Sequence, residues 1–378
     1  MTSLLSSHVV ARPRFSRSAN VERDHGLRAI EGSLPTGRIA HVIARIARGL
    51  SDPAAGRAFS LTGPHGGGKS SFAVFVDALL SASSTPEHKS SHRILHSVDE
   101  GVQHRLVTGL KSMGANRKGF LRASATAQAE PVAATVGRAL YTAALRDFGM
   151  DQQLVPKSFV GGGSAPSNSD ITACVSRICE EKPLIIVIDE FGKNLEYFAS
   201  SSEDGDPFLL QNLAELTQGE GALPLLVMTM QHLSFEDYLQ QDSSVRRREW
   251  SKVQGRFQDI PFIESPSEAR RLIGASLESV TSDFDKAAAL WLNRNRKTLE
   301  SLGLRDLLPD VRDALPLHPV TLAVLPELCS RYGQNERTLF SFLAGSEPNA
   351  VPAFLDRMAW SPGQNLPLIG LDLLYDYF

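Results

Sequence analysis

Residues 57–72 read RAFSLTGPHGGGKSSF. The octet Gly63–Ser70 fits the pattern G-x-x-x-x-G-K-S, with a short alternating apolar run before it and a helical apolar run, residues 72–80, after it. A strand, a glycine-rich loop and a helix in this order gather backbone N–H groups at a helix N-terminus, where an anion is stabilised. The stretch therefore predicts a phosphate-binding loop of the Walker A type, and the alternative is a glycine-rich turn without a ligand.

Each residue type in the loop suits a nucleotide. The glycines allow a positive φ and a close approach of the backbone to phosphate, Lys69 supplies a point charge for the β- and γ-phosphates, and the Ser70 hydroxyl is suited to Mg²⁺. The expected cofactors are thus ATP and Mg²⁺. The candidate nucleotide-binding residues here are Gly63, Pro64, His65, Gly66, Gly67, Gly68, Lys69, Ser70 and Ser71.

A second motif follows at residues 184–190, which read LIIVIDE. Five consecutive apolar residues, four of them β-branched, predict a strand buried on both faces of a parallel sheet. Ligands of open α/β sheets bind outside the carboxyl ends of the strands, where Asp189 and Glu190 stand. We interpret this as a Walker B motif, with Asp189 holding Mg²⁺ and Glu190 orienting or deprotonating the attacking water. The alternative is an apolar strand that ends in a polar turn.

Composition limits the class of protein. The 378 residues are 42% apolar and 21% charged, with a net charge of −3, so any nucleic-acid binding must be local. No apolar run is long enough for a membrane span, and the N-terminus does not have the pattern of a signal peptide. The three cysteines lack metal or redox spacing, and we expect no structural metal among the ten histidines. A cytoplasmic location without a membrane partner is expected.

Breaks in the pattern suggest four segments. Residues 1–24, polar and basic, are expected to be a flexible arm, residues 25–265 a P-loop ATPase core, and residues 266–345 an all-α lid domain that opens with a capping box at Ser265. Within the core, residues 81–92 are expected to be a mobile connection before a helix over 94–113. Residues 346–378, with a dense apolar stretch from Leu366 to Phe378, suggest the start of a further domain, and so a chain that is one module of something longer or an obligate subunit. The alternative is that they fold back as a final helix.

The order of these elements resembles AAA+ ATPases, over residues 25–345. The similarity is greatest to their origin-recognition and STAND-like branch, because residues 255–268 (GRFQDIPFIESPSE) resemble its junction between core and lid. This resemblance implies an α/β fold with a parallel five-stranded sheet in the order 5-1-4-3-2, followed by the helical lid. Two stretches, residues 188–197 and 334–343, are also similar to ATPases of bacterial anti-phage defence systems.

The resemblance further implies roles for individual residues. Thr229 or Gln231 would be sensor 1, and Arg256 an arginine finger that acts on the nucleotide of a neighbouring subunit. Arg337 would be sensor 2, and His318, in the stretch LPLHP, would contact the nucleotide. The alternatives are an ion pair for Arg256, a helix-surface charge for Arg337, and a loop histidine packed against the lid for His318.

Two functions remain open. The first is a Mg²⁺-dependent ATP-hydrolysing switch or motor that forms homo-oligomers, with a role in phage defence or DNA transactions. The second is a scaffold that binds ATP or ADP, turns over negligibly, and recruits DNA or an effector protein. A small-molecule kinase is disfavoured, because helices follow the fifth strand where a kinase has a lid around a substrate pocket.

Overall fold

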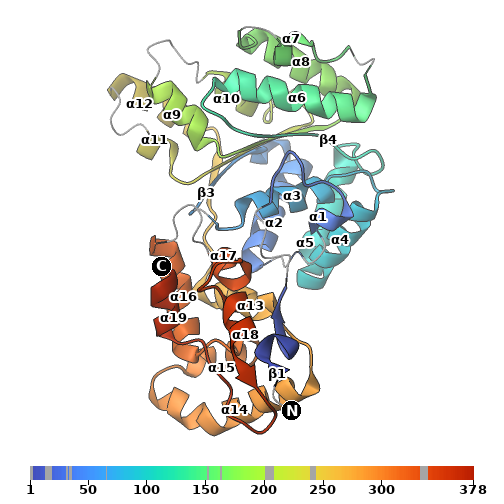
Figure 1. Cartoon of the computed structure of the whole chain (residues 1–378). Coiled ribbons are helices and arrows are strands. Elements are labelled where there is room, and N and C mark those ends of the chain that lie inside the picture. The colour runs from blue at the N-terminus through green and yellow to red at the C-terminus, as the bar shows by residue number, and fades with distance from the viewer. Residues whose placement is uncertain are drawn as a thin grey trace. The chain divides into compact units, whose positions relative to one another are not determined.

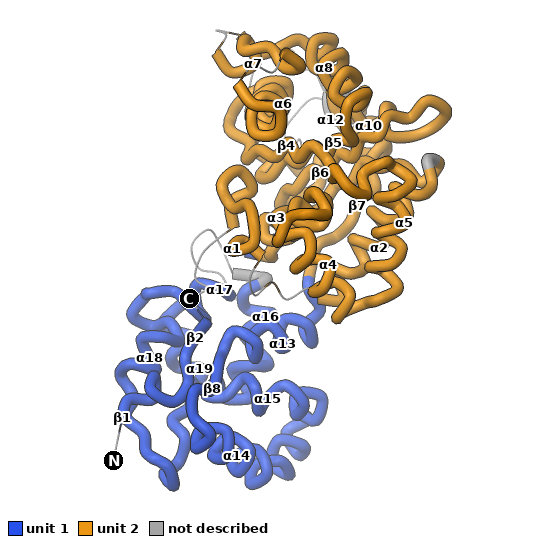
Figure 2. Tube along the Cα trace, turned by 90° about the vertical axis from the view of Figure 1, so that its right-hand side faces the viewer, with its two compact units in different colours: residues 1–18, 64–66, 264–378 blue, residues 19–63, 67–263 orange. Residues whose placement is uncertain are grey.

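A computed structural model describes residues 3–12, 19–30, 33, 36–64, 66–150, 153–161, 164–200, 208–238, 244–332 and 339–378. The chain forms two compact units (Figure 2). The larger comprises Ala19–Gly63 and Gly67–Ile263, and the smaller comprises Met1–Ser18, Pro64–Gly66 and Glu264–Phe378. Among the described residues, no helix is both long enough and apolar enough to cross a membrane.

The larger unit is built on one parallel sheet. Its strands along the chain are β3 (Ala58–Thr62), β4 (Leu121–Thr126), β5 (Leu184–Asp189), β6 (Leu225–Gln231) and β7 (Gln258–Pro261). They lie in the order β4-β5-β6-β3-β7, and every neighbouring pair is parallel. Numbered along the chain, this order is 5-1-4-3-2, which confirms the α/β fold class and the expected sheet order.

Helices cover both faces of this sheet (Figure 1). Ile185 and Val187 of β5 belong to one apolar core and Ile186 and Ile188 to another, as the alternation of a doubly buried strand requires. The first core is formed with α1 (Leu27–Ile30), α2 (Gly37–Ser51), α3 (Lys69–Leu79), α4 (Pro86–Val98) and α5 (Glu100–Ser112). The second is formed with α6 (Val132–Phe148), α7 (Ser158–Gly161), α8 (Asn168–Glu181), α9 (Gly192–Ser200), α10 (Phe208–Glu215), α11 (Phe235–Tyr238) and α12 (Ser244–Gln254).

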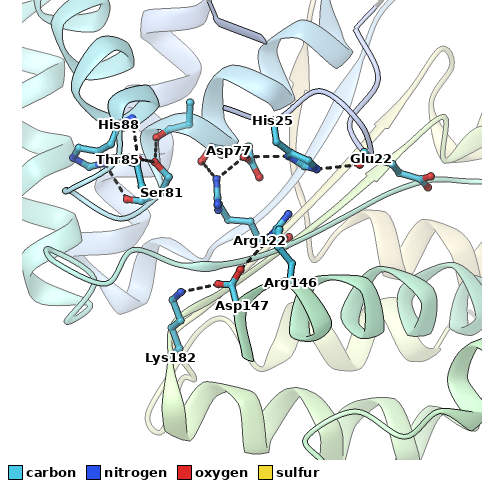
Figure 3. Close-up of polar contacts among 11 residues, drawn as sticks. Glu22, His25, Asp77, Ser81, Thr85, His88, Arg122, Arg146, Asp147 and Lys182 are labelled. Atoms are coloured by element: carbon cyan, nitrogen blue, oxygen red, sulfur yellow. Dashed lines mark hydrogen bonds and ion pairs between the residues drawn. The ribbon is translucent and has the colours of Figure 1, made fainter. Parts of the chain in front are cut away.

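The helix after the phosphate loop, α3, is tied to the edge strand β4 by a buried ion pair. Asp77 of α3 lies 2.7 Å from the guanidinium of Arg122, and the His25 ring lies 3.6 Å from the same carboxylate oxygen (Figure 3). Breaking such a buried pair on one side costs several kcal/mol, about 3–5 in measured cases. The pair therefore fixes α3, and with it the loop at its N-terminus, against the sheet.

The expected mobile connection at residues 81–92, and the single helix over 94–113, are wrong. Helix α4 begins at Pro86, after an N-cap at Thr85 whose hydroxyl accepts from the backbone N–H of His88 at 3.3 Å. It ends at Asp99, whose side chain accepts from the N–H of Val102 at 2.8 Å and starts α5. The sequence Thr-Pro-Glu at residues 85–87 is typical of a helix start.

A pair of histidines, His88 and His92, lies four residues apart on α4 and contacts the C-terminal end of α3. The rings of His88 and His92 stack at 4.1 Å. His88 Nδ1 donates to the carbonyl oxygen of Ser81 (Figure 3), and His92 Nε2 donates to that of Leu79, at 2.9 and 3.1 Å. Carbonyl groups at the end of α3 are thereby satisfied by side chains. Burial lowers the pKa of His88, and it lowers the pKa of His92 to about 4.

This depressed pKa predicts a loss of stability in mild acid. The unfolded chain takes up a proton at His92 near its ordinary value of 6.5, whereas the folded chain does so only near 4. The free energy of unfolding should therefore fall as the pH drops from about 6.5 to 4, by about 3 kcal/mol from this group. Urea denaturation at pH 7 and pH 4 measures this loss. It should shrink in His92→Gln and stay unchanged in a control at an exposed histidine, His104→Gln. An equal loss in both variants would contradict the assignment.

The smaller unit is mainly helical, with two short antiparallel pairings. Its helices are α13 (Pro266–Ser276), α14 (Ser282–Ser301), α15 (Leu308–Ala314), α16 (Pro319–Tyr332), α17 (Leu339–Ala344), α18 (Val351–Arg357) and α19 (Leu371–Tyr377). The capping box expected at Ser265 is present, with Glu268 as its partner. Residues 277–279, expected to be helical, instead form β8 (Leu277–Ser279), because they pair with β2 (Val9–Ala11) of the N-terminal segment.

The expectation of a flexible arm over residues 1–24 is therefore wrong for its described parts. Like β2, the strand β1 (Ser3–Leu4) has a partner, since it pairs with β9 (Ala359–Trp360). Leu5, which lies between β1 and β2 in the chain, is fully buried. In the larger unit, Glu22 accepts from the backbone N–H of Thr126 at 2.8 Å and pairs with Arg138 at 2.7 Å. Polar composition concealed these contacts, because they are made with segments far away in the sequence.

The C-terminal stretch shares the core of the smaller unit. The apolar residues Leu366, Ile369, Leu373, Leu374 and Tyr377 are buried with those of α13 to α18. The Tyr377 hydroxyl donates to Ser341 Oγ at 2.7 Å, and its ring lies 5.0 Å from that of Phe342. Residues 346–378 thus pack with the preceding helices, as the alternative of a final folded-back helix expects, and do not form a separate domain.

This packing predicts different effects for neighbouring residues of α19. Leu374 is 2% exposed and Tyr375 is 85% exposed. Leu374→Ala leaves a cavity and should destabilise the protein by about 2–5 kcal/mol, whereas Tyr375→Ala should change stability by less than about 0.5 kcal/mol. Thermal denaturation of both variants measures this difference. Equal melting temperatures for Leu374→Ala and the parent protein would show that α19 is not part of the core.

Candidate functional site

The phosphate loop leaves the carboxyl end of β3 with a backbone that requires glycine. A Cβ on Gly63 would lie 2.2 Å from the carbonyl oxygen of Phe262, and the N–H of Gly63 donates to the Gln231 carbonyl at 3.2 Å. Gly66 and Gly68 have φ values of 66° and 82°, which other residues rarely adopt. Gly68 is the N-cap of α3, and no side chain caps this helix. The helix N-terminus is thus suited to an anion.

Lys69 lies inside the loop and is only 6% exposed. Its Nζ donates to the carbonyl oxygen of Gly63 at 2.6 Å and lies 3.4 Å from His232 Nδ1. Burial lowers the pKa of Lys69 to about 8, while the carboxylates of Asp189 and Glu190 oppose this shift. Burial removes water from this ammonium. A phosphate group at the loop would interact with it in place of that water.

The structure brings Ser70 and Asp189 together, although 118 residues separate them in the chain. Ser70 Oγ donates to Asp189 Oδ2 at 2.6 Å, and the backbone N–H of Glu190 donates to Asp189 Oδ1 at 2.9 Å. Asp189 is 5% exposed, and burial raises its pKa. A hydroxyl and a carboxylate oxygen from two elements are ligands that Mg²⁺ accepts. The residues present therefore fit a magnesium ion, which would also stabilise the charged form of the Asp189 carboxylate.

Glu190 occupies a tight turn directly after β5. It is the one described non-glycine residue with a positive φ, 52°, and positions of this kind concentrate at functional sites. The turn is held by the N–H of Phe191, which donates to the Met230 carbonyl at 2.9 Å. The Glu190 side chain is 41% exposed and forms an ion pair with Lys193 of α9. Sequence reasoning assigned no role to Lys193, because only its position one turn after Glu190 indicates this pair.

The two residues expected as sensor 1 lie at the carboxyl end of β6. Thr229 and Gln231 are fully buried, and along β6 they alternate with Met228 and Met230, which pack in the core that contains α3. They therefore lie on the other face of the sheet. Gln231 Nε2 donates to Ser60 Oγ at 2.6 Å and to Thr62 Oγ1 at 3.2 Å. The residue of this segment that contacts Lys69 is His232, the first residue after the strand, and strand parity could have indicated it.

Arg256 lies at the amino ends of the strands, whereas the phosphate loop lies at their carboxyl ends. It precedes β7, whose first residue, Gln258, pairs with Phe59 near the amino end of β3. Its guanidinium lies 3.3 Å from the Glu215 carboxylate, and both side chains are partly exposed. The ion pair given as the alternative for Arg256 is thus present, and the residue does not contribute to the site of its own subunit.

Some of the remaining candidate residues lie outside the described part of the chain, and the others lie within it. Arg337 and His65 lie outside the described residues. His318 belongs to the smaller unit, where its ring nitrogen Nδ1 accepts from the N–H of Val320 at 3.2 Å and its ring lies 6.4 Å from that of Trp291. Burial lowers its pKa. Ser71 is exposed on the first turn of α3, and Pro64 is half-buried.

No family model matches the sequence, and no curated protein matches it. Among solved structures, the chain is similar to ORC2 of Aeropyrum pernix, determined as ADPNP and ADP complexes, with 15% identity and a TM-score of 0.39. The alignment covers 82% of this chain and 72% of that one. A likeness of this size carries no argument about function.

Proposed function

We propose that this chain binds ATP with Mg²⁺ and hydrolyses it, as a P-loop ATPase of the AAA+ type. The observation that carries the proposal is the 2.6 Å contact between Ser70 and Asp189, next to the buried Lys69, at the carboxyl edge of a 5-1-4-3-2 sheet. A hydroxyl, a carboxylate and a lysine at one glycine-rich loop form the set of groups that holds a metal-bound triphosphate.

Each side chain then has a chemical task. Lys69 leaves the Gly63 carbonyl and binds the β- and γ-phosphates. Ser70 and Asp189 would hold the metal ion, which would supply positive charge against the charge that develops on the phosphates. Glu190 accepts a proton from the water that attacks the γ-phosphorus, and the bond to the bridging oxygen of ADP breaks. For this step Glu190 must leave Lys193, because the carboxylate that forms the ion pair is the one that must reach the water.

That ion pair is also the observation that favours the second function, a scaffold with negligible turnover. If Lys193 keeps Glu190 engaged when ATP is bound, nucleotide would be retained and would serve to recruit DNA or an effector protein. The pair is half-exposed, with 50% and 41% of the two side chains accessible, so its contribution is about 1 kcal/mol or less. We therefore favour hydrolysis.

We also propose that the active form is a homo-oligomer, with Arg256 acting on the nucleotide of a neighbouring copy. The support is its place at the amino ends of the strands, opposite to the carboxyl ends where its own loop lies. A cytoplasmic location, supported by three free cysteines, belongs to the same proposal. A role in phage defence rests only on the similarity of residues 188–197 and 334–343.

Turnover per subunit, measured against protein concentration, tests hydrolysis in trans. It should rise with concentration in the parent protein, because the finger is supplied by a partner, and an arginine finger contributes about 10³-fold or more. Arg256→Ala should lower it to the dilute value, and the control Arg105→Ala, at an exposed arginine of α5, should leave it unchanged. Turnover that is constant with concentration would contradict the trans assignment, and no turnover at all would favour the scaffold.

A further inference from the structure

Two loops of the candidate site meet at a single tyrosine hydroxyl. We use the name Tyr238 latch for Gly192, His232 and Tyr238, which are the first residue of α9, the first residue after β6 and the last residue of α11. The Tyr238 hydroxyl accepts from the backbone N–H of His232 at 3.3 Å. On its other side it lies against Gly192, where an added Cβ would be 2.3 Å from the hydroxyl oxygen. The latch therefore requires both a hydroxyl at 238 and the absence of a side chain at 192.

The two ends of the latch lead to different groups of the candidate site. Gly192 is two residues after Glu190, in the turn that the Phe191–Met230 hydrogen bond holds. His232, at the other end, has its ring nitrogen 3.4 Å from Lys69 Nζ. One hydroxyl thus joins the backbone that carries the candidate base to the residue that contacts the candidate phosphate-binding lysine.

The surroundings of the latch are packed and leave it little freedom. Phe191, next to Gly192, lies 5.2 Å from the ring of Phe235 in α11, and both rings are fully buried. Burial raises the pKa of Tyr238, so its hydroxyl keeps its proton at neutral pH. Packing would hold the aromatic ring without the hydroxyl, so the hydroxyl itself is not needed for the fold.

We propose that Tyr238 is a positioning residue for hydrolysis. It holds Glu190 in position relative to Lys69 and His232. The proposal rests on the proposed function, since it assumes that Lys69 binds phosphate and that Glu190 activates water. Binding of ATP at Lys69 moves the His232 ring. The Tyr238 latch transmits this movement to the turn that carries Glu190. Loss of the latch should therefore lower the rate of hydrolysis while ATP still binds.

Tyr238→Phe is the direct test, because it removes the hydroxyl and keeps the ring. We expect the single-turnover rate of ATP hydrolysis to fall about tenfold, with the Kd for ATP within about twofold of the parent value. The matched control is Tyr197→Phe on α9, since no hydrogen bond of the Tyr197 hydroxyl occurs within the described part of the chain. Its rate should equal that of the parent protein. A parent-like rate in Tyr238→Phe would overturn the proposal.

A double-mutant cycle tests the contact with Gly192. Gly192→Ala forces Tyr238 away and should slow hydrolysis by about 100-fold, because small displacements of a positioned group have large effects on rate. The same change made in Tyr238→Ala should cost little further, since the partner of the clash is already gone. Equal effects of Gly192→Ala in both backgrounds would overturn the proposal. A parent protein that neither binds nor hydrolyses ATP would instead refute the proposed function, so the two failures are distinguishable.

Discussion

Lys69→Ala is expected to weaken ATP binding by about 100-fold or more. Each hydrogen bond from the ammonium to a phosphate oxygen is worth about 1.5–3 kcal/mol, so loss of two such bonds accounts for this factor. The fold should survive the change, because burial already disfavours the charged form of Lys69, as its lowered pKa shows. Isothermal titration calorimetry with ATP and Mg²⁺ measures the affinity, and circular dichroism confirms the fold.

Lys89→Ala is the matched control for this experiment, since Lys89 is an exposed lysine of α4 in the same unit. Its affinity for ATP should equal that of the parent protein. Unchanged ATP binding in Lys69→Ala would show that the glycine-rich loop does not bind the triphosphate.

Glu190→Gln is expected to separate binding from hydrolysis. It removes the carboxylate that would take the proton from water and keeps both Ser70 and Asp189, so turnover should fall by about 10²–10⁴-fold while ATP stays bound. The amide also loses the ion pair with Lys193, which contributes little at this exposed position. Phosphate release under single-turnover conditions measures the loss of rate, and filter retention of labelled ATP measures the bound nucleotide.

Glu196→Gln, at an exposed glutamate of α9, should hydrolyse ATP at the parent rate and serves as the control. If Glu190→Gln also hydrolyses at that rate, the base lies elsewhere. If the parent protein binds ATP and neither protein hydrolyses it, the scaffold becomes the better account.

Local patterns account for the parts of the fold that the sequence predicted well. The run at residues 184–189 is apolar on both faces, so a buried strand is its only stable setting, and the octet at 63–70 needs glycines wherever it folds. The sheet order, in contrast, came from the family resemblance, because nothing within a strand specifies its neighbours.

The predictions that failed depend on partners distant in sequence. Residues 277–279 follow a helical pattern but pair with residues 9–11 of a segment whose composition suggested an arm. The three-residue strands are too short to give a signal, and only the tertiary pairing stabilises them. The start of α4 is different, because its cap at Thr85 and Pro86 is a local signal in the sequence that needs no distant partner.

The candidate site shows the same division. Ser70 and Asp189, taken from the two predicted motifs, are in contact, since the first turn of α3 and the end of β5 meet at the carboxyl ends of the strands. The sensor role of Thr229 or Gln231 stays a prediction, and the contact between Lys69 and His232, the residue after the strand, was not predicted. Lys193 and Tyr238 could not be assigned, because their relevance arises from contacts between loops and not from any motif.

Titration of the parent protein with ATP, with Mg²⁺ and then with excess chelator, tests the central claim most directly. The account predicts saturable binding of one ATP per chain in Mg²⁺, and clearly weaker binding after chelation, because Ser70 and Asp189 then lose the ion that links them to the phosphates. Absence of saturable binding at millimolar ATP, or an affinity that does not depend on Mg²⁺, would contradict it.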